Sequence, residues 1–334
     1  MKIILNSFIK IDNLLKDESH QNLENKILAD LKSTPKKISS TLFYDEEGSR
    51  LFEEITNLPE YYLTRTEKVL LKKAALCLSE ELKNIDIIEF GSGDCSKISI
   101  ILDNIPKINR KTIRYIPFDV SIAAVEKSSN ILTSKFPDVT VNGIVADFLT
   151  QLNEVPIENN KLICFLGSTI GNFSMKKALH FLIELSKIMH PGDLLLIGFD
   201  MVKNKEVLER AYNDRENVTE KFNKNILNVV NRIIGTDFNS ESFKHVAFYN
   251  EDFSRIEMHL EAIEDLEVNC PGLLLNIYLK KGERIHTENS HKFTIQDINN
   301  LASSAGLEIQ NIFIDDNKWF SLVHMIKRKE RNND

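Results

Sequence analysis

Short apolar segments rich in β-branched residues alternate with helical stretches between residues 85 and 200 of this 334-residue chain. Strands are expected at five such segments, which are 85–90, 114–118, 139–145, 162–166 and 194–199. Helices are expected between them, for example over 122–135 and 176–189, where apolar residues recur at helical spacing. Strands that alternate with helices predict a mostly parallel sheet covered on both faces. The expected fold class is therefore α/β, with a Rossmann-like core.

This alternation stops near residue 200 and resumes towards the end of the chain. In between we expect a polar helical region at 205–234 and two antiparallel strands at 245–250 and 255–264. An apolar run at 273–279 and a polar segment at 282–291 follow. A helix and two strands should then complete the sheet, at 295–306, 307–314 and 319–326. The expected division is a core of residues 59–202 plus 292–334 and a second, α+β domain of residues 1–58 plus 203–291.

The charge and the cysteines weigh against several classes of protein. The net charge is -7, whereas a protein that grips a phosphate backbone usually carries a basic face, so we expect no nucleic-acid partner. No apolar run approaches the roughly 20 residues that span a bilayer, so we expect no membrane partner. The four cysteines lie far apart in sequence, which predicts no metal site and is typical of reduced thiols: Cys77, Cys95, Cys164 and Cys270. We expect a cytoplasmic monomer that acts on a small molecule.

A glycine turn, EFGSG at 89–93, follows the first expected strand of the core. Glycine is needed at such a turn because a side chain would block the approach of a ligand to the backbone. A dinucleotide fingerprint would carry a third glycine, but DCS follows at 94–96. A pyrophosphate would miss that glycine, whereas a sulfonium nucleoside has no phosphate and tolerates the change. Taken alone, the motif is weak evidence and favours a plain tight turn, whereas the strand before it and the amphipathic stretch after it strengthen the case for a ligand turn.

Two aspartates follow the second and third expected strands of the core, at Asp119 and Asp147. Ligands of open α/β sheets bind beyond the carboxyl ends of the strands, so Asp119 is placed to accept hydrogen bonds from ribose hydroxyls. Asp147 and the following Phe148 are placed to bind and pack an adenine. Helix capping is the alternative for either aspartate, but the turn and both aspartates in this order favour a nucleoside cofactor. Lys97 could meet a methionine carboxylate, yet periodicity leaves S-adenosylmethionine and a nicotinamide cofactor both open.

Several longer strings go beyond this fold-level pattern. Two are long and specific, LPEYY-L-TRTE at 58–67 and FLGSTIGN at 165–172. Shorter ones accompany them, LFYD at 42–45, GS at 48–49, RAY at 210–212, FN at 222–223 with Asn225, and RIEM at 255–258. Together they closely resemble the histidine-specific Nα-methyltransferase family, in the same order from about residue 33 to the end of the chain. The first 30 or so residues carry no such resemblance.

The resemblance implies a class I methyltransferase core, with S-adenosylmethionine as methyl donor and the α-amino group of L-histidine as acceptor. Three transfers would give the trimethyl betaine hercynine, on the route of ergothioneine biosynthesis. The implied cofactor contacts are the positions that the strand ends indicate separately, with Lys97: Gly91, Lys97, Asp119, Asp147 and Phe148. The implied ligands of the amino and carboxylate groups of the substrate are Tyr61, Asn172 and Tyr212. The implied imidazole ligands are Glu288 and Ser290, and the residues implied to shape the pocket are Met258 and Phe52. The implied catalytic residues are Tyr44 and Asn172.

The sequence leaves the identity of the methyl acceptor open. A related branch of the family methylates indole-containing amino acids, and another amino acid or a small amine would need only a changed pocket. An indole could not use a carboxylate and a hydroxyl as an imidazole can, so Glu288, Ser290 and Met258 together favour histidine. His291 stands where the family pattern leads us to expect a small residue.

Ordinary structural roles and other functions also stay open. Tyr61 could be a half-buried packing residue, Asn172 could belong to a turn or cap a helix, and Glu288 could be a solvated carboxylate. The competing functions are a nicotinamide oxidoreductase, a nucleoside-binding module without catalysis and a nucleic-acid methyltransferase. The missing third glycine argues against the first, the intact set of implied acceptor residues against the second and the acidic charge against the third.

Overall fold

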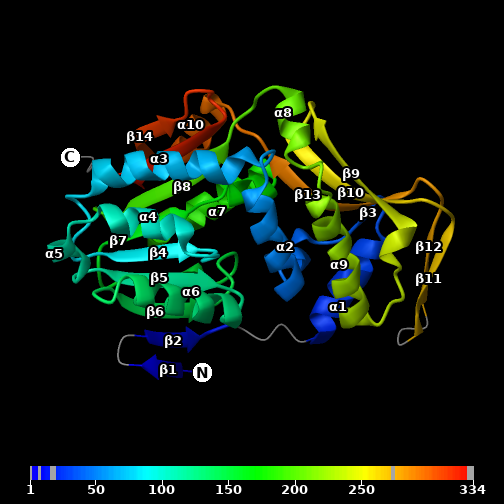
Figure 1. Ribbon diagram of the computed structural model, residues 1–334, viewed down its shortest axis with the longest axis horizontal. Coiled ribbons are helices and arrows are strands. Elements are labelled where there is room, and N and C mark those ends of the chain that lie inside the picture. Colours follow the sequence, from blue (N-terminus) through cyan, green and yellow to red (C-terminus); the bar gives the residue numbers. More distant parts are fainter. Residues whose placement is uncertain (1, 7–8, 16–19, 272–274, 329–334) are drawn as a thin grey trace, which may run out of the picture. The chain divides into compact units, whose positions relative to one another are not determined.

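The computed structural model describes residues 2–6, 9–15, 20–271 and 275–328, and the chain divides into two compact units (Figure 1). Unit 1 comprises residues 1–16, 65–202 and 293–334, and unit 2 comprises residues 17–64 and 203–292. The chain therefore enters unit 2 twice, and each unit is built from separate segments of sequence.

Unit 1 holds a nine-stranded sheet in the order β1-β2-β6-β5-β4-β7-β8-β15-β14. Its strands are β1 Lys2–Asn6, β2 Ile9–Asn13, β4 Asp86–Phe90, β5 Arg114–Asp119, β6 Thr140–Val145, β7 Lys161–Phe165, β8 Leu194–Asp200, β14 Leu307–Ile314 and β15 Phe320–Lys327. The six from β2 to β8 run parallel, whereas β1, β15 and β14 each pair with a neighbour in antiparallel register. This confirms the α/β, Rossmann-like fold.

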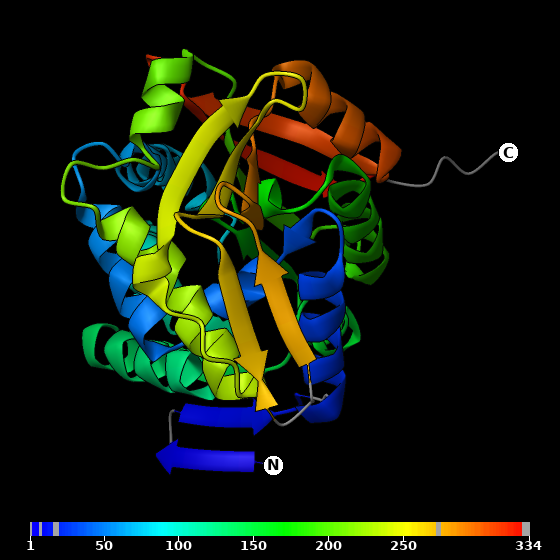
Figure 2. The same cartoon turned by 90° about the vertical axis from the view of Figure 1, so that its right-hand side faces the viewer.

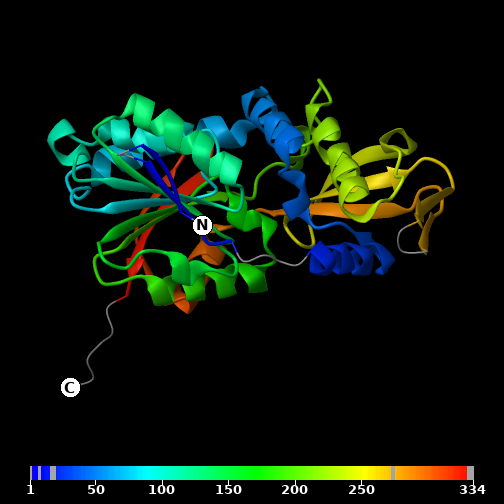
Figure 3. The same ribbon diagram turned by 90° about the horizontal axis from the view of Figure 1, so that it is seen from below.

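Helices cover both faces of this sheet, as Figure 3 shows from below. They are α3 Tyr62–Leu78, α4 Ser96–Asn104, α5 Lys107–Arg110, α6 Ile122–Lys135, α7 Met175–Ile188 and α10 Ile295–Ser304. One hydrophobic core joins α7 and α10 to the sheet, and Phe165, Phe181 and Leu301 are among its buried members. Capping serine side chains fix the start of two helices, because Ser121 accepts from Ala124 N at 3.2 Å and Ser174 from Lys177 N at 3.3 Å.

The strand order places the ends of β4, β5 and β6 at one edge. Strand β4 lies between β5, which leads to β6, and β7, which leads to β8, so the order reverses direction at β4. In open α/β sheets a ligand binds beyond the carboxyl ends of the strands at such a switch point. The residues that follow β4, β5 and β6 are therefore positioned by the topology.

The N-terminal segment differs from the expected division, which placed residues 1–58 in the second domain. Strand β2 pairs in parallel with β6, from Ile9 opposite Val141 to Asn13 opposite Val145, so it extends the sheet of unit 1. Ile9 and Ile11 are buried there with Val125. So short a strand could not be recognised from periodicity, because only the partner strand and helix α6 give it a buried face.

Unit 2 contains a four-stranded sheet, β3-β13-β10-β9, and a separate hairpin, β11-β12. Its strands are β3 Lys36–Lys37, β9 Phe243–Asn250, β10 Arg255–Ala262, β11 Leu266–Cys270, β12 Leu275–Leu279 and β13 Arg284–His291, and its helices are α1 His20–Lys32, α2 Glu46–Asn57, α8 Lys205–Arg210 and α9 Val218–Ile234. Helix α9 packs against β9, β10 and α2 (Figure 2). Asp214 accepts from the backbone nitrogens of Val218 and Thr219, both at 2.8 Å, at the first turn of α9.

Two expectations for this unit need revision. The helical region 205–234 is two helices, α8 and α9, and the polar segment 282–291 is largely strand β13. No element was expected for the polar segment, because the alternation of β13 is broken by a register shift between Met258 and His259 on its partner β10. Residues 273 and 274 of the expected apolar run 273–279 lie outside the described residues.

Candidate active site

The glycine turn after β4 leaves open space above its backbone. Gly91 has φ +78° and Gly93 φ +47°, and a Cβ added at either would meet nothing within 4 Å. Gly91 N donates to Phe118 O at 3.0 Å, which ties the turn to the end of β5. Where a dinucleotide fingerprint continues, Cys95 takes the left-handed conformation with φ 58° and is buried. An open turn with positive φ fits the close approach of a nucleoside cofactor.

Backbone nitrogens of two loops, one after β4 and one after β5, hold the carboxylate of Asp119. One oxygen accepts from Ser92 N at 3.3 Å and the other from Ser121 N at 3.0 Å. Burial raises the pKa of Asp119, and these backbone donors partly oppose that shift. The N-cap of α6 is Ser121, so Asp119 does not have the capping role that was its alternative.

Asp147 and Phe148 lie at the end of β6. Asp147 organises its own turn, since its carboxylate accepts from Leu149 N at 2.8 Å and from Thr150 Oγ1 at 3.1 Å. The Phe148 ring packs on Phe90, with ring centroids 5.4 Å apart. Each carboxylate oxygen keeps a second lone pair, so the turn role does not remove Asp147 as an acceptor.

Lys97 makes an ion pair that the sequence did not reveal. Its Nζ lies 2.7 Å from Glu67 Oε2, and the Glu67 side chain is fully buried. Glu67 Oε1 accepts from Gly167 N at 2.7 Å, at the start of the loop that leads to Asn172. Glu67 belongs to the TRTE string, which offered a signal, but the pairing requires α3, α4 and β7 to be assembled.

Asn172 ends the 3₁₀ helix Thr169–Asn172 of unit 1. This loop is fixed by the left-handed Ser168, whose hydroxyl accepts from Asp200 N at 2.9 Å. The N-cap of the following helix α7 is Ser174, so Asn172 does not cap that helix.

Glu89 is a second buried acid that the sequence reasoning did not single out. It accepts from Tyr115 Oη at 2.6 Å, directly before the glycine turn. Burial raises the pKa of Glu89 to about 8. An acid held neutral at this position fixes the end of β4 without placing a full charge in the core.

Unit 2 arranges four of the expected aromatic residues in a row, in which each ring contacts the next. The rings of Tyr44 and Phe52 are 5.8 Å apart, those of Phe52 and Tyr61 6.2 Å, and those of Tyr61 and Tyr212 6.4 Å, each in an edge-to-face arrangement. Tyr44 is 44 % exposed, whereas Tyr61 and Tyr212 are buried. All four rings present apolar faces, and the three tyrosines add hydroxyls.

Strands β10 and β13 place Met258, Glu288 and Ser290 on one face. Met258 lies opposite Glu288 in the antiparallel register, and Ser290 is two residues along the same strand. All three are buried. Within the described residues we find no hydrogen bond to the Glu288 carboxylate from a side chain or backbone, and burial raises its pKa to about 7. The solvated carboxylate that was the alternative is therefore not what the structure has.

The same face carries Tyr212 and Lys292. Tyr212 Oη donates to Ser290 Oγ at 2.8 Å, while Lys292 Nζ donates to Ser290 Oγ at 2.8 Å and to Tyr212 Oη at 3.2 Å. Lys292 is only 2 % exposed. It follows His291 in the sequence, but a lysine there gave no sequence signal of burial.

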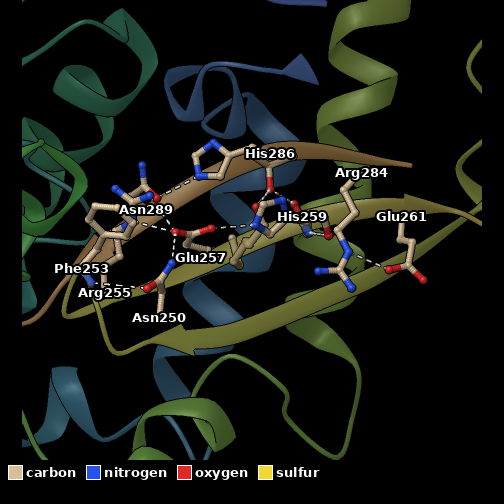
Figure 4. Close-up of polar contacts among 12 residues, drawn as sticks. Asn250, Phe253, Arg255, Glu257, His259, Glu261, Arg284, His286 and Asn289 are labelled. Atoms are coloured by element: carbon tan, nitrogen blue, oxygen red, sulfur yellow. Dashed lines mark hydrogen bonds and ion pairs between the residues drawn. The ribbon is translucent and has the colours of Figure 1, made fainter. Parts of the chain in front are cut away.

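The opposite face of β10 and β13 carries a different polar network, centred on Glu257 (Figure 4). Glu257 accepts from Asn250 at 2.9 Å and lies 3.1 Å from His259 Nε2. His291 is on this side by strand alternation, opposite Arg255. The unusual His291 therefore faces away from Ser290.

Neither a metal centre nor a membrane-spanning helix is present in the described ranges. No group of three His, Cys, Asp or Glu side chains is arranged to hold a metal ion. None of the helices there is long and apolar enough to cross a membrane.

Comparison with known proteins agrees with this architecture. The profile of the S-adenosylmethionine-dependent, histidine-specific methyltransferases matches residues 23–327. A histidine N-alpha-methyltransferase of Mycobacterium tuberculosis (strain CDC 1551 / Oshkosh) is 36 % identical over 296 residues, which is 89 % of this chain and 92 % of the relative. One of Mycolicibacterium smegmatis is 36 % identical over 294 residues, 88 % of this chain and 91 % of the relative. Ergothioneine biosynthesis protein 1 of Schizosaccharomyces pombe is 35 % identical over 244 residues, covering 70 % of this chain and 31 % of that protein. This chain belongs to the family of S-adenosylmethionine-dependent, histidine-specific methyltransferases.

Proposed function

We propose that this enzyme methylates the α-amino group of L-histidine three times, to the trimethyl betaine hercynine used in ergothioneine biosynthesis. Membership of the histidine-specific family supports the acceptor. The observation that carries the proposal is the Glu288 carboxylate, which is buried on one face with Met258 and Ser290 and has no hydrogen-bond partner among the described residues. A buried polar group without a partner is costly unless a ligand satisfies it. An imidazole N–H is such a ligand.

The residues at the carboxyl ends of β4, β5 and β6 fit S-adenosylmethionine. Its sulfonium, when bound, supplies an electrophilic methyl group. Gly91 leaves open space for the nucleoside, and Asp119 offers acceptor oxygens for the two ribose hydroxyls. We assign Asp147 to the adenine amino group, Phe148 to the face of its ring and Lys97 to the methionine carboxylate.

The amino-acid end of the substrate would be held by Tyr61, Asn172 and Tyr212, with Phe52 and Met258 shaping its surroundings. An ammonium has no lone pair, so the amine must lose a proton before it can attack. The α-amino group titrates near ~8 in peptides and somewhat higher in free amino acids, so this loss requires little driving force. We assign Asn172 to orienting the amine and the partly exposed Tyr44 to passing its proton to water. Correct positioning of reacting groups can itself supply ~7–11 kcal/mol.

We also propose that the enzyme is a cytoplasmic monomer. Cys77, Cys95 and Cys164 are free thiols, which suits a reducing compartment. Light scattering of the purified protein tests the monomer, and a mass of two or more chains would refute it.

The decisive experiment incubates the protein with S-adenosylmethionine and the twenty amino acids, followed by mass spectrometry. Three added methyl groups on histidine alone are expected. Methylation of a different amino acid or of an indole would keep the fold and methyl donor but overturn the imidazole assignment. No transfer, with S-adenosylmethionine still bound in calorimetry, would instead favour a binding module.

Two variants test the residue assignments. Glu288→Ala should relax discrimination between histidine and other amino acids, and an unchanged preference would remove Glu288 from the imidazole site. Asp119→Ala should abolish S-adenosylmethionine binding in calorimetry, whereas unchanged affinity would overturn the ribose assignment.

A further inference from the structure

Lys292 is a buried cation at the end of β13 to which neither the sequence motifs nor the proposed function gives a role. Only 2 % of it is exposed. Its ammonium donates to the hydroxyls of Ser290 and Tyr212, at 2.8 and 3.2 Å, and lies 5.0 Å from the centre of the Tyr212 ring. All three residues belong to unit 2. We call Tyr212, Ser290 and Lys292 the hydroxyl triad.

The donors and acceptors of the triad can be counted. A lysine ammonium only donates, and a serine hydroxyl has one hydrogen and two lone pairs. Ser290 Oγ accepts from Lys292 and from Tyr212, both at 2.8 Å, so both of its lone pairs are occupied. The Ser290 hydroxyl can then form a further hydrogen bond only by donating its hydrogen. No acceptor for that hydrogen is found within the described parts of the chain.

Glu288 has the opposite polarity on the same face. An ionised carboxylate only accepts. Burial raises the pKa of Glu288 to about 7, and the positive charge of Lys292 opposes the shift and favours the ionised form. Two neighbouring positions of one strand face therefore present an acceptor at 288 and a donor at 290.

We propose that Lys292 sets this polarity, by committing Ser290 to donate, and so selects an acceptor substrate whose ring offers a lone-pair nitrogen to Ser290 and an N–H to Glu288. This inference rests on the proposed function and adds its specificity determinant. A neutral imidazole in a single tautomer has both groups. An indole has an N–H and no lone-pair nitrogen, and an imidazolium has two N–H groups. Lys292 is thus a positioning residue that acts through Ser290.

The test measures the dissociation constant of L-histidine by calorimetry for the wild type, Lys292→Met, Ser290→Ala and the double variant. Each single variant should weaken binding about tenfold, which is the worth of one hydrogen bond of about 1.4 kcal/mol. The dissociation constant of the double variant should lie within about twofold of that of the single variant that binds histidine more weakly, because both substitutions remove the same donor. An additive loss of about 100-fold would overturn the inference. Histidine affinity unchanged by Lys292→Met would also overturn it.

The affinities of a series of histidine analogues measure this polarity directly and do not depend on catalysis. The two thiazolylalanines, with the ring joined at carbon 4 or at carbon 5, each keep a lone-pair nitrogen at one of the two imidazole nitrogen positions and carry sulfur at the other. Thienylalanine has no ring nitrogen. The wild type should bind at least one thiazolylalanine about tenfold more tightly than thienylalanine. Lys292→Met should lose that preference. An intact preference would show that Ser290 donates without Lys292.

Control variants keep the test falsifiable if Lys292→Met unfolds. Lys292→Gln keeps an N–H donor but removes the charge, so it should retain more of the preference for a ring nitrogen than Lys292→Met, and an equal loss in both would contradict the inference. Asn289→Ala lies on the opposite face and removes only the contact to His286, 2.9 Å long, so it should bind histidine normally (Figure 4). If Ser290→Ala itself leaves histidine binding unchanged, the imidazole assignment of Ser290 fails and this inference with it, whereas a wild type that does not bind histidine would overturn the proposed function. If only Lys292→Met leaves it unchanged, this inference alone fails.

Discussion

Glu67 accepts a hydrogen bond from the backbone nitrogen of Gly167 at 2.7 Å, across 100 residues of chain. The other oxygen of the same carboxylate lies 2.7 Å from Lys97 Nζ. One fully buried side chain of α3 therefore fixes both the lysine assigned to the methyl donor and the start of the loop that ends at Asn172. If the proposed assignments of Lys97 and Asn172 hold, Glu67 would connect cofactor binding and amine orientation within unit 1.

Two substitutions of Glu67 should separate its two contacts. Glu67→Gln keeps an oxygen for Gly167 N but loses the charge that holds Lys97. It should weaken S-adenosylmethionine binding by ~10-fold with little loss of turnover, since a charged hydrogen bond contributes ~1.5–3 kcal/mol. Glu67→Ala loses both contacts and should lower turnover as well. Calorimetry and steady-state kinetics measure the two effects, and identical behaviour of the two variants would show that the Gly167 contact does not act separately.

Removing the charge of Glu288 should stabilise the protein while weakening histidine binding. The pKa of Glu288 is raised to about 7 by burial, so its protonated form favours the folded state, and that stability is lost as pH rises from the ordinary carboxyl range through 7. At pH 8, Glu288→Gln should therefore unfold at higher urea, by at most about 3 kcal/mol. At pH 4 the two proteins should be equally stable. A variant less stable than wild type at pH 8 would contradict this account.

The ion pair of Lys161 and Asp193 tests the core of unit 1 away from the chemistry. Their side chains are fully buried and Lys161 Nζ lies 2.7 Å from Asp193 Oδ2. Asp193→Ala leaves a buried ammonium without its charge partner and should cost ~3–5 kcal/mol in urea unfolding. The exposed pair Lys187 and Glu184 is the matched control, and Glu184→Ala should produce no measurable change. Similar losses in both would show that burial does not decide the effect.

His259 should make the protein sensitive to acid. Burial and the neighbouring His286 lower the pKa of His259 to about 4, so the folded state favours the neutral ring (Figure 4). The unfolded chain takes up the proton near pH 6.5, and stability therefore falls as pH decreases from 6.5 towards 4. His259→Gln should lose less stability than wild type between pH 7.5 and 4.5, by at most about 3 kcal/mol. Urea unfolding at both pH values measures the difference, and parallel losses would assign the acid sensitivity to other groups such as His286 and His291, whose pKa values are also lowered.

The sequence by itself determined the elements whose signals are local. The helix expected over 122–135 is α6, Ile122–Lys135, and the strand expected over 307–314 is β14, Leu307–Ile314. The glycine turn and Asp119 were predicted from the order of strands and turns. Periodicity, caps and glycines act over a few residues, so they can be interpreted before the chain is folded.

Tertiary structure alone decided which polar groups are buried and what they contact. Glu67 meets Gly167 across 100 residues, and Lys292 meets Tyr212 across 80. Strand β13 is a strand because β10 and β3 supply its partners, although its own residues are mostly polar. A lone lysine or glutamate has the same local signature whether solvated or buried, and only partners brought close by the fold make its burial favourable.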